Sequence, residues 1–202
     1  MGHVLINLLL ARVILGDEYP FPMPDTALVI IDVQREILEG SPPAHDPATL
    51  LANIGTLLAE ARRQNVMVVF VQDDTVGGGP GNEDWEIPAA IAPREDEIRI
   101  RKRNCDSFHE TPLGGLLRER GIAHLIVAGC STPYCIDTSC RRAVTLGYRV
   151  TLAGDAHSTC DSNVLPATSI IAHHNQVLNG FGADIGEQEF LIAVKPTAEV
   201  RF

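Results

Sequence analysis

The sequence predicts a single α/β domain of three layers, in which helices cover both faces of a six-stranded, mainly parallel sheet. Short apolar runs rich in β-branched residues alternate with longer segments whose apolar residues recur at helical spacing. This alternation is typical of right-handed β–α–β crossovers and of a Rossmann-like topology. The length of 202 residues suits one compact core.

The first half of this pattern begins with the run 27–31, which is wholly apolar, as in a strand buried on both faces. Residues 46–64 place leucine, isoleucine and alanine at helical spacing, and a second buried strand follows at 66–71. Segment 73–97 is rich in Gly and Pro and is predicted to be a loop. Residues 98–101 form the predicted third strand.

The second half repeats the alternation, with helix ends marked by glycine. The predicted helices are 113–120, 134–146, 163–178 and a short last one at 188–194. The predicted strands are 124–128, 148–152 and 183–185.

Residues 1–25 are interpreted as an N-terminal extension of a domain that spans 26–202. The stretch Val4–Gly16 is apolar but too short to cross a bilayer, and prolines at 20, 22 and 24 prevent a helix after it. The stretch is either a helix that packs on a partner subunit or an upstream addition to a chain starting at Met23. An apolar segment of this size needs cover, so a homodimer or homotetramer is expected.

The composition excludes two classes of partner. A formal net charge of −10 opposes binding to nucleic acid or to an anionic membrane surface. The five cysteines are an odd number, and no secretory leader is recognisable, which favours a reducing, cytoplasmic location over a disulfide framework. The expected partner is a small-molecule substrate, with no cofactor.

Three reactive side chains follow three different strands of the predicted sheet. Asp32 comes directly after the first strand, Lys102 after the third, and Cys135 shortly after the fourth, at the start of a helix. Sites in open parallel sheets form outside the carboxyl ends of the strands, so these side chains are expected to meet. A helix N-terminus and a nearby lysine would lower the pKa of the thiol, and Asp32 could accept its proton.

Each residue alone has a plainer explanation. An Asp at a strand end is often a turn former, a Lys in the basic run 99–103 is often a solvated side chain, and a buried Cys is often inert. His157 and the pair His173–His174 are interpreted as structural or surface residues. The combination of Asp32, Lys102 and Cys135 in one predicted site favours catalysis.

The residues around these positions also resemble a known family. The segments Leu28–Gln34 (LVIIDVQ), Lys102–Leu113 (KRNCDSFHETPL) and Val127–Cys135 (VAGCSTPYC) resemble, in order, the three motifs of the isochorismatase-like cysteine hydrolases. The resemblance extends from about Thr26 to Val194. It implies that Asp32 is the base, Lys102 the positioning cation and Cys135 the nucleophile. It also implies a cis peptide between Cys130 and Ser131, with the amides of Ser131 and Cys135 as the oxyanion hole.

Two departures from family patterns narrow the expected activity. The nicotinamidase branch carries a D-x-H metal site, whereas the corresponding stretch here, 72–77, contains no histidine, so no bound metal is expected. Isochorismatases that cleave vinyl ethers lack the nucleophilic cysteine, and this chain keeps Cys135. The predicted activity is therefore hydrolysis of a C–N bond in a small amide, carbamoyl compound or lactam through a thioester. A vinyl-ether hydrolase and a catalytically silent binding protein are the alternatives.

The pocket around the predicted site is less defined. The glycine-rich stretch 77–81 lacks the pattern of a phosphate-binding loop and is interpreted as part of a lid that brings in Trp85. Phe108 and Tyr134 flank the predicted triad in the sequence. We therefore expect Trp85, Phe108 and Tyr134 to contact the substrate.

Overall fold

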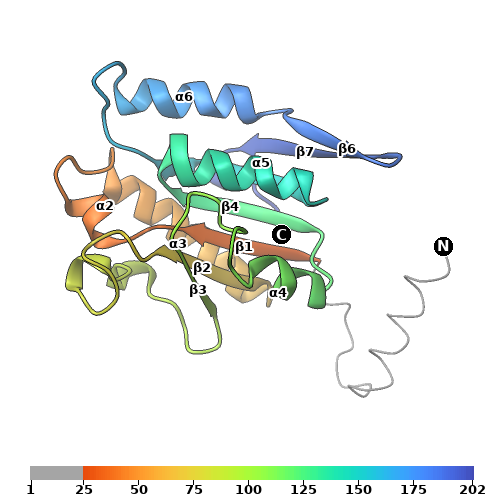
Figure 1. Ribbon diagram of the computed structural model, residues 1–202, viewed down its shortest axis with the longest axis horizontal. Coiled ribbons are helices and arrows are strands. Elements are labelled where there is room, and N and C mark those ends of the chain that lie inside the picture. The colour runs from red at the N-terminus through yellow and green to blue at the C-terminus, as the bar shows by residue number, and fades with distance from the viewer. Residues whose placement is uncertain (1–24) are drawn as a thin grey trace.

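A computed structural model describes residues 25–202 and contains a seven-stranded sheet in the order β3-β2-β1-β4-β5-β7-β6 (Figure 1). All neighbouring strands run parallel except β6 and β7, which form an antiparallel hairpin at one edge. The predicted three-layer fold with a mainly parallel sheet is confirmed, although the sheet has one strand more than expected.

The elements have the following bounds. The strands are β1 (Thr26–Ile31), β2 (Met67–Asp73), β3 (Ile98–Lys102), β4 (His124–Cys130), β5 (Arg149–Ser158), β6 (Gly182–Ile185) and β7 (Gln188–Lys195). The α-helices are α2 (Arg35–Glu39), α3 (Pro47–Arg63), α4 (Leu113–Glu119), α5 (Asp137–Thr145) and α6 (Ala167–Leu178). A π-helical turn, η3 (Thr132–Ile136), leads into α5, and short 3₁₀ turns lie at Glu83–Trp85, Ala89–Ile91 and Thr197–Glu199.

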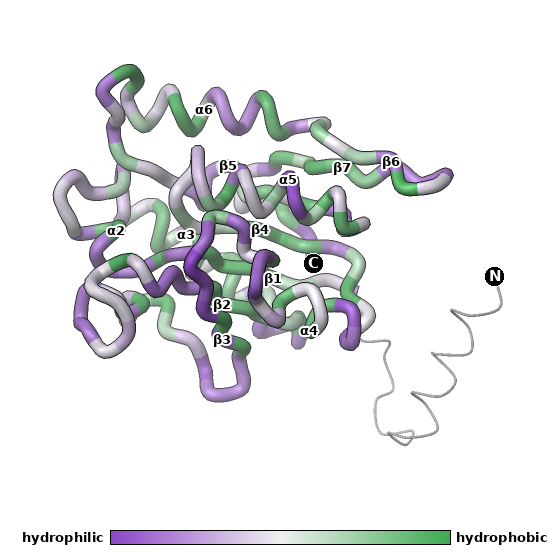
Figure 2. The backbone as a smooth tube through the Cα atoms, in the orientation of Figure 1, coloured by the Kyte–Doolittle hydropathy of each residue, from purple (hydrophilic) through white to green (hydrophobic). Residues whose placement is uncertain are grey.

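Alternate residues of the buried strands supply two separate cores, one on each face of the sheet. Ala27, Val29 and Ile31 of β1 pack towards α4, α5 and the end of α6. Leu28 and Ile30 of the same strand pack towards α2 and α3. Because successive side chains of a strand point to opposite faces, a strand covered on both sides must be apolar throughout. Figure 2 shows this concentration of hydrophobic residues along the central strands.

The prediction of a last helix at 188–194 is wrong, because this segment is strand β7. It pairs in parallel with β5, placing Ile192 opposite Val150, and it turns back from β6 through Gly186, whose φ is 65°. The run Phe190–Val194 is apolar and too short for its periodicity to distinguish a helix from a strand. Pairing with β5 and burial of Ile192 decide in favour of the strand.

The helix α2 was not predicted, and the loop 73–97 contains the first two 3₁₀ turns. No helix within residues 25–202 is both long enough and apolar enough to cross a membrane. The predicted extension, with its apolar stretch Val4–Gly16, lies almost wholly outside the described residues.

Candidate active site

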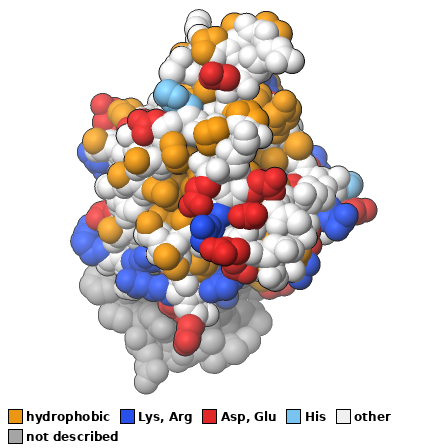
Figure 3. All heavy atoms as spheres, turned by 90° about the vertical axis from the view of Figure 1, so that its left-hand side faces the viewer, with side chains coloured by type: hydrophobic (Ala, Val, Ile, Leu, Met, Phe, Trp, Pro, Cys, Tyr) orange, Lys and Arg blue, Asp and Glu red, His pale blue; other side chains and the backbone are white. Residues whose placement is uncertain are grey.

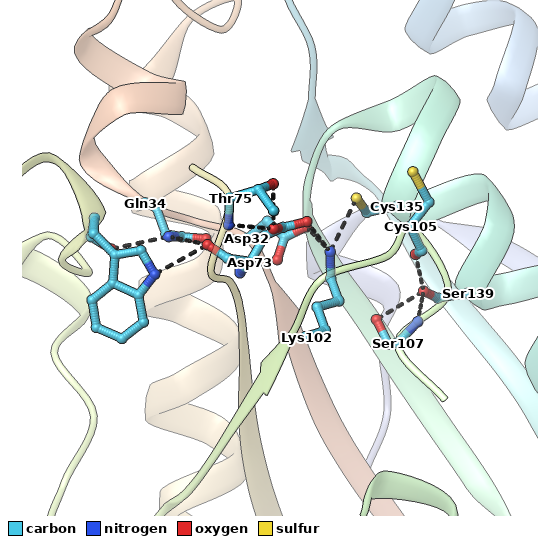
Figure 4. Close-up of polar contacts among 10 residues, drawn as sticks. Asp32, Gln34, Asp73, Thr75, Lys102, Cys105, Ser107, Cys135 and Ser139 are labelled. Atoms are coloured by element: carbon cyan, nitrogen blue, oxygen red, sulfur yellow. Dashed lines mark hydrogen bonds and ion pairs between the residues drawn. The ribbon is translucent and has the colours of Figure 1, made fainter. Parts of the chain in front are cut away.

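Three strands deliver charged side chains to one point at the carboxyl edge of the sheet. Asp32 follows β1, Asp73 ends β2 and Lys102 ends β3 (Figure 4). The Lys102 Nζ atom lies 2.7 Å from Oδ2 of Asp32 and 3.1 Å from Oδ2 of Asp73. It also lies 3.3 Å from the Sγ atom of Cys135, which the turn η3 presents from the end of β4. The structure therefore brings Asp32, Lys102 and Cys135 together, and it adds a second carboxylate.

The cluster of Asp32, Asp73, Lys102 and Cys135 is shielded from solvent. Asp32 is 1% exposed, Lys102 2% and Cys135 9%. Lys102 alternates with exposed arginines along β3, so its side chain points inward while Arg101 points outward to pair with Asp74. The interpretation of Lys102 as a solvated side chain is thereby excluded.

Only one of the two carboxylate oxygens of Asp32 has a partner among the described residues. Oδ2 binds Lys102, whereas Oδ1 is buried and accepts no hydrogen bond from the residues that the structure describes. The backbone of Asp32 has a φ of 50°, a left-handed conformation that Asp adopts more readily than most residues, and its amide donates to the Val71 carbonyl at 2.8 Å. A buried carboxylate oxygen without a donor can accept a proton.

Burial raises the pKa of Asp32 to about 6, against the opposing effect of Lys102. Burial would lower the pKa of Lys102, but the surrounding Asp32, Cys135 and Asp73 outweigh it and raise that pKa. The pKa of Asp73 is lowered despite partial burial, because Thr75 and Lys102 donate to it. At neutral pH the cluster thus contains two carboxylates and one ammonium group.

The thiol of Cys135 behaves differently from the expectation. Burial, followed by the negative charge of Asp32, raises its pKa, and Lys102 offsets only part of this effect. The predicted lowering of the thiol pKa is therefore wrong. Cys135 lies within the π-turn η3 and is itself buried, and desolvation of the sulfur outweighs the ammonium group beside it.

The turn that carries Cys135 begins with a cis peptide bond between Cys130 and Ser131. The amides of Tyr134 and Ile136 donate to the Ser131 carbonyl at 3.0 and 3.3 Å, whereas the Cys135 amide between them does not. Among the described residues, the Ser131 amide also donates to no backbone or side-chain acceptor. The Ser131 amide is thus left for another acceptor.

Gly129 allows the turn to approach β1. Its φ is 124°, and a Cβ atom at this position would lie 2.0 Å from the Ile31 carbonyl oxygen. Only glycine combines this conformation with so close a contact. Gly129 thereby sets the distance between the end of β4 and Asp32.

Gln34 ties the ends of β1 and β2 together. It is fully buried, its Oε1 accepts from the Asp73 amide at 2.8 Å, and its Nε2 donates to the carbonyls of Asp73 and Trp85 at 3.1 Å each. The Trp85 indole in turn donates to the Asp73 carbonyl at 3.0 Å. Trp85 is therefore fixed beside Asp73 rather than held in a free lid.

The other two predicted pocket residues occupy different surroundings. The Phe108 ring stacks on Tyr148 with centroids 5.9 Å apart and packs against the core. Tyr134 is 61% exposed. A cavity of about 290 Å³ lies instead between α2, the start of loop 73–97 and Ser131. Its lining includes Glu36, Thr75 and Cys160, and it includes none of Trp85, Phe108 and Tyr134.

Sequence reasoning missed Asp73 and Gln34. The rule that selected Asp32 and Lys102 also applies to Asp73, because it ends the second strand. The stretch 72–77 contains no histidine, and Asp73 is the carboxylate within it that lies at the strand end. Gln34 follows Asp32 by two residues and was visible only as part of the family motif.

One group of side chains has a composition that could hold a metal ion. The ligand atoms of Asp32, Asp73 and Cys135 all lie within 4.8 Å of one another. The Lys102 ammonium, however, contacts all three side chains and neutralises one of the two carboxylate charges.

Solved structures of isochorismatase-family proteins have this three-layer fold with a mainly parallel sheet. Residues 26–171 match the isochorismatase domain, and the chain belongs to the isochorismatase family. The resemblance found in the sequence is thereby confirmed.

Three relatives illustrate the similarity. Streptothricin hydrolase from Streptomyces noursei is 34% identical over 149 residues, which cover 72% of this chain and 59% of the relative. The chain thus spans less than two thirds of the length of that relative. A crystal structure of an isochorismatase from Pseudomonas putida KT2440 has a TM-score of 0.77 and 30% identity, covering 94% of this chain and 97% of the other. A cysteine hydrolase from Pseudomonas syringae pv. phaseolicola 1448A has a TM-score of 0.77 and 25% identity, covering 89% of this chain and 92% of the other.

Proposed function

We propose that the protein is a cysteine amidohydrolase that cleaves a C–N bond of a small amide, carbamoyl compound or lactam. The observation that carries the proposal is the buried Lys102 ammonium, which joins Asp32, Asp73 and the Cys135 sulfur within 3.3 Å. A nucleophile and a base within 4.8 Å of each other, both in contact with one orienting cation, form the arrangement that acyl transfer requires. The similarity to streptothricin hydrolase and to a cysteine hydrolase supports the same class.

The resting state follows from the pKa shifts. At neutral pH Asp32, with a pKa of about 6, is ionised, whereas the Cys135 thiol keeps its proton. The nucleophile is therefore generated by general-base catalysis, and no preformed thiolate is needed. Oδ1 of Asp32, to which none of the described residues donates, is the acceptor for the thiol proton.

In the first half-reaction the sulfur attacks the carbonyl carbon while its proton passes to Asp32. The carbonyl oxygen becomes an oxyanion that the amides of Ser131 and Cys135 stabilise. Collapse of this intermediate breaks the C–N bond, and the proton on Asp32 moves to the departing nitrogen. The products of this half are an amine or ammonia and a thioester on Cys135.

In the second half-reaction water attacks the thioester. Asp32, ionised again, accepts a proton from the water, and the same amides bind the second oxyanion. The thiol leaves and recovers a proton from Asp32. Lys102 keeps its proton throughout, since the carboxylates raise its pKa, and it holds Asp32 and the sulfur in position.

The surroundings favour an uncharged or cationic substrate. Among the described residues, the cavity next to Ser131 is lined by one carboxylate, Glu36, and by no Lys or Arg. Figure 3 looks onto this edge of the sheet and shows acidic side chains gathered around a small basic area near its centre. A dianion would meet repulsion here, whereas an amine or amide N–H group would be attracted.

A screen for ammonia and amine release over primary amides, ureido acids and lactams tests the proposal, with Cys135→Ala as the matched control. Turnover that disappears in Cys135→Ala supports it. Turnover of isochorismate alone, unchanged in Cys135→Ala, would instead establish the vinyl-ether hydrolase. A protein that binds these compounds without turning any over would be the silent binding protein.

A further inference from the structure

A buried histidine outside the cluster connects the turn Ser131–Cys135, which carries the proposed nucleophile, to helix α6. His157 lies near the end of β5, opposite Gly129 of β4, and is 3% exposed. Its Nδ1 atom lies 2.9 Å from Oγ1 of Thr132, and its Nε2 atom lies 2.8 Å from Oδ1 of Asn175 in α6. Both ring nitrogens are therefore engaged, one on each side.

The network fixes the tautomer of the ring. Nδ2 of Asn175 donates to the Gly154 carbonyl at 2.8 Å, so the oxygen Oδ1 faces His157. Nε2 of His157 therefore carries the proton and donates to Asn175, and Nδ1 accepts from the Thr132 hydroxyl. A neutral imidazole is the form that accepts at one nitrogen and donates at the other, and burial lowers the pKa of His157 in the same sense.

On the Nδ1 side of His157, this series of hydrogen bonds ends at Thr132, the first residue of the turn η3. Thr132 is fully buried and opens η3, so it stands between Ser131 and Cys135. Its side chain is the only one of the turn that is anchored to β5 by a hydrogen bond among the described residues. Any displacement of Thr132 shifts the two amides and the sulfur that the proposed mechanism uses.

We propose that His157 is a positioning residue that holds the Ser131–Cys135 turn in its reactive geometry through the Thr132 hydroxyl. This inference rests on the proposed function. His157 does not touch the cluster, and it acts by fixing where the sulfur and the two amides lie. Asn175 in turn fixes the imidazole.

The chain offers matched substitutions that separate the two ends of the ring. In His157→Asn the new side-chain oxygen can take the place of Nδ1 and still accept from Thr132. In His157→Gln the longer amide reaches Asn175 and leaves the Thr132 hydroxyl without its acceptor. Thr132→Val removes the hydroxyl at nearly constant volume, and Thr132→Ser keeps it. His173→Asn, an exposed position in α6, is the control.

We expect His157→Gln and Thr132→Val to lower kcat by at least about tenfold with KM nearly unchanged, since small misplacements of a reacting group have effects of this size. His157→Asn and Thr132→Ser should restore most of kcat. The double variant of His157→Gln and Thr132→Val should lose no more than either alone, because both break the same contact.

Iodoacetamide labelling of Cys135, followed by peptide mass, gives a second readout that needs no substrate. The same two variants should slow labelling of Cys135 and leave Cys105 unaffected. If labelling slows while the wild type hydrolyses no amide, the positioning role stands and the amidohydrolase proposal fails. Wild-type labelling and kcat in Thr132→Val, or losses in all four variants that merely follow their melting temperatures, would overturn the role of His157.

Discussion

Replacing Asp73 by Asn tests the electrostatics of the cluster. The oxygens of Asp73 and Asp32 lie within 4.8 Å of each other, and the negative charge of Asp73 contributes to the raised pKa of Asp32. Two unit charges at this distance interact with roughly 3.5 kcal/mol at an effective dielectric constant of about 20, which corresponds to about 2.5 pKa units. The ammonium of Lys102 already offsets part of this repulsion, so removal of Asp73 should lower the pKa of Asp32 by about 1 unit.

The direction of the change in activity follows from the role of Asp32. The carboxylate form accepts the proton, so kcat/KM should fall as the pH drops through about 6, the pKa of Asp32. In Asp73→Asn this acid limb should move down towards pH 5. At pH 5 the wild type should then keep about a tenth of its maximal kcat/KM and the variant about half.

The assay is the pH profile of kcat/KM with an amide from the ammonia-release screen. The matched control is Asp74→Asn, because the neighbouring Asp74 pairs with Arg101 at 2.8 Å and lies outside the cluster. An unchanged or higher midpoint in Asp73→Asn, or an equal shift in Asp74→Asn, would refute the reasoning.

Three further predictions concern the cation, metals and assembly. Lys102→Met leaves two carboxylates without their cation, so the protein should lose activity and about 3 kcal/mol of stability. The pKa of Asp32 rises further in this variant. Chemical denaturation should therefore show a larger loss of stability at pH 8 than at pH 5. Treatment with a strong chelator should leave activity unchanged, because Lys102 already supplies the positive charge between Asp32, Asp73 and Cys135, and loss of activity restored by zinc would contradict this. Light scattering should return a homodimer or homotetramer. The reason is that Val164 and Leu165 are 85% and 44% exposed, which favours their burial against a second copy of the chain. A 21.9 kDa species would contradict this prediction.

Much of the fold was predictable because the central strands are buried on both faces. Runs such as 27–31 and 66–71 have no polar residue that could make their assignment ambiguous. The prediction of a helix at 188–194 was wrong because the strand forms through pairing with β5, and no local sequence pattern indicates that pairing. The short helix α2 contains one buried residue, Leu38, so it carries little periodic signal.

The meeting of Asp32, Lys102 and Cys135 was predictable from chain order, because parallel strands all end at the same edge. The protonation of the cluster was not, since it depends on how completely each group is desolvated. Sequence favoured a lowered thiol pKa from a neighbouring lysine and a helix start, and burial reversed that sign at Cys135. The link from Asn175 through His157 to Thr132 joins residues 18 and 25 positions apart, and no spacing rule predicts it.

The most direct test of the central claim measures the rate at which iodoacetamide labels Cys135 from pH 4.5 to 9, in the wild type and in Asp32→Asn. If Asp32 is the base for a thiol that is protonated at rest, the wild-type rate should rise with a midpoint near pH 6, the pKa of Asp32. The rate in Asp32→Asn should be at least about tenfold lower at pH 7, as expected for loss of a general base. A midpoint near that of an ordinary thiol, equal in both proteins, would contradict the account.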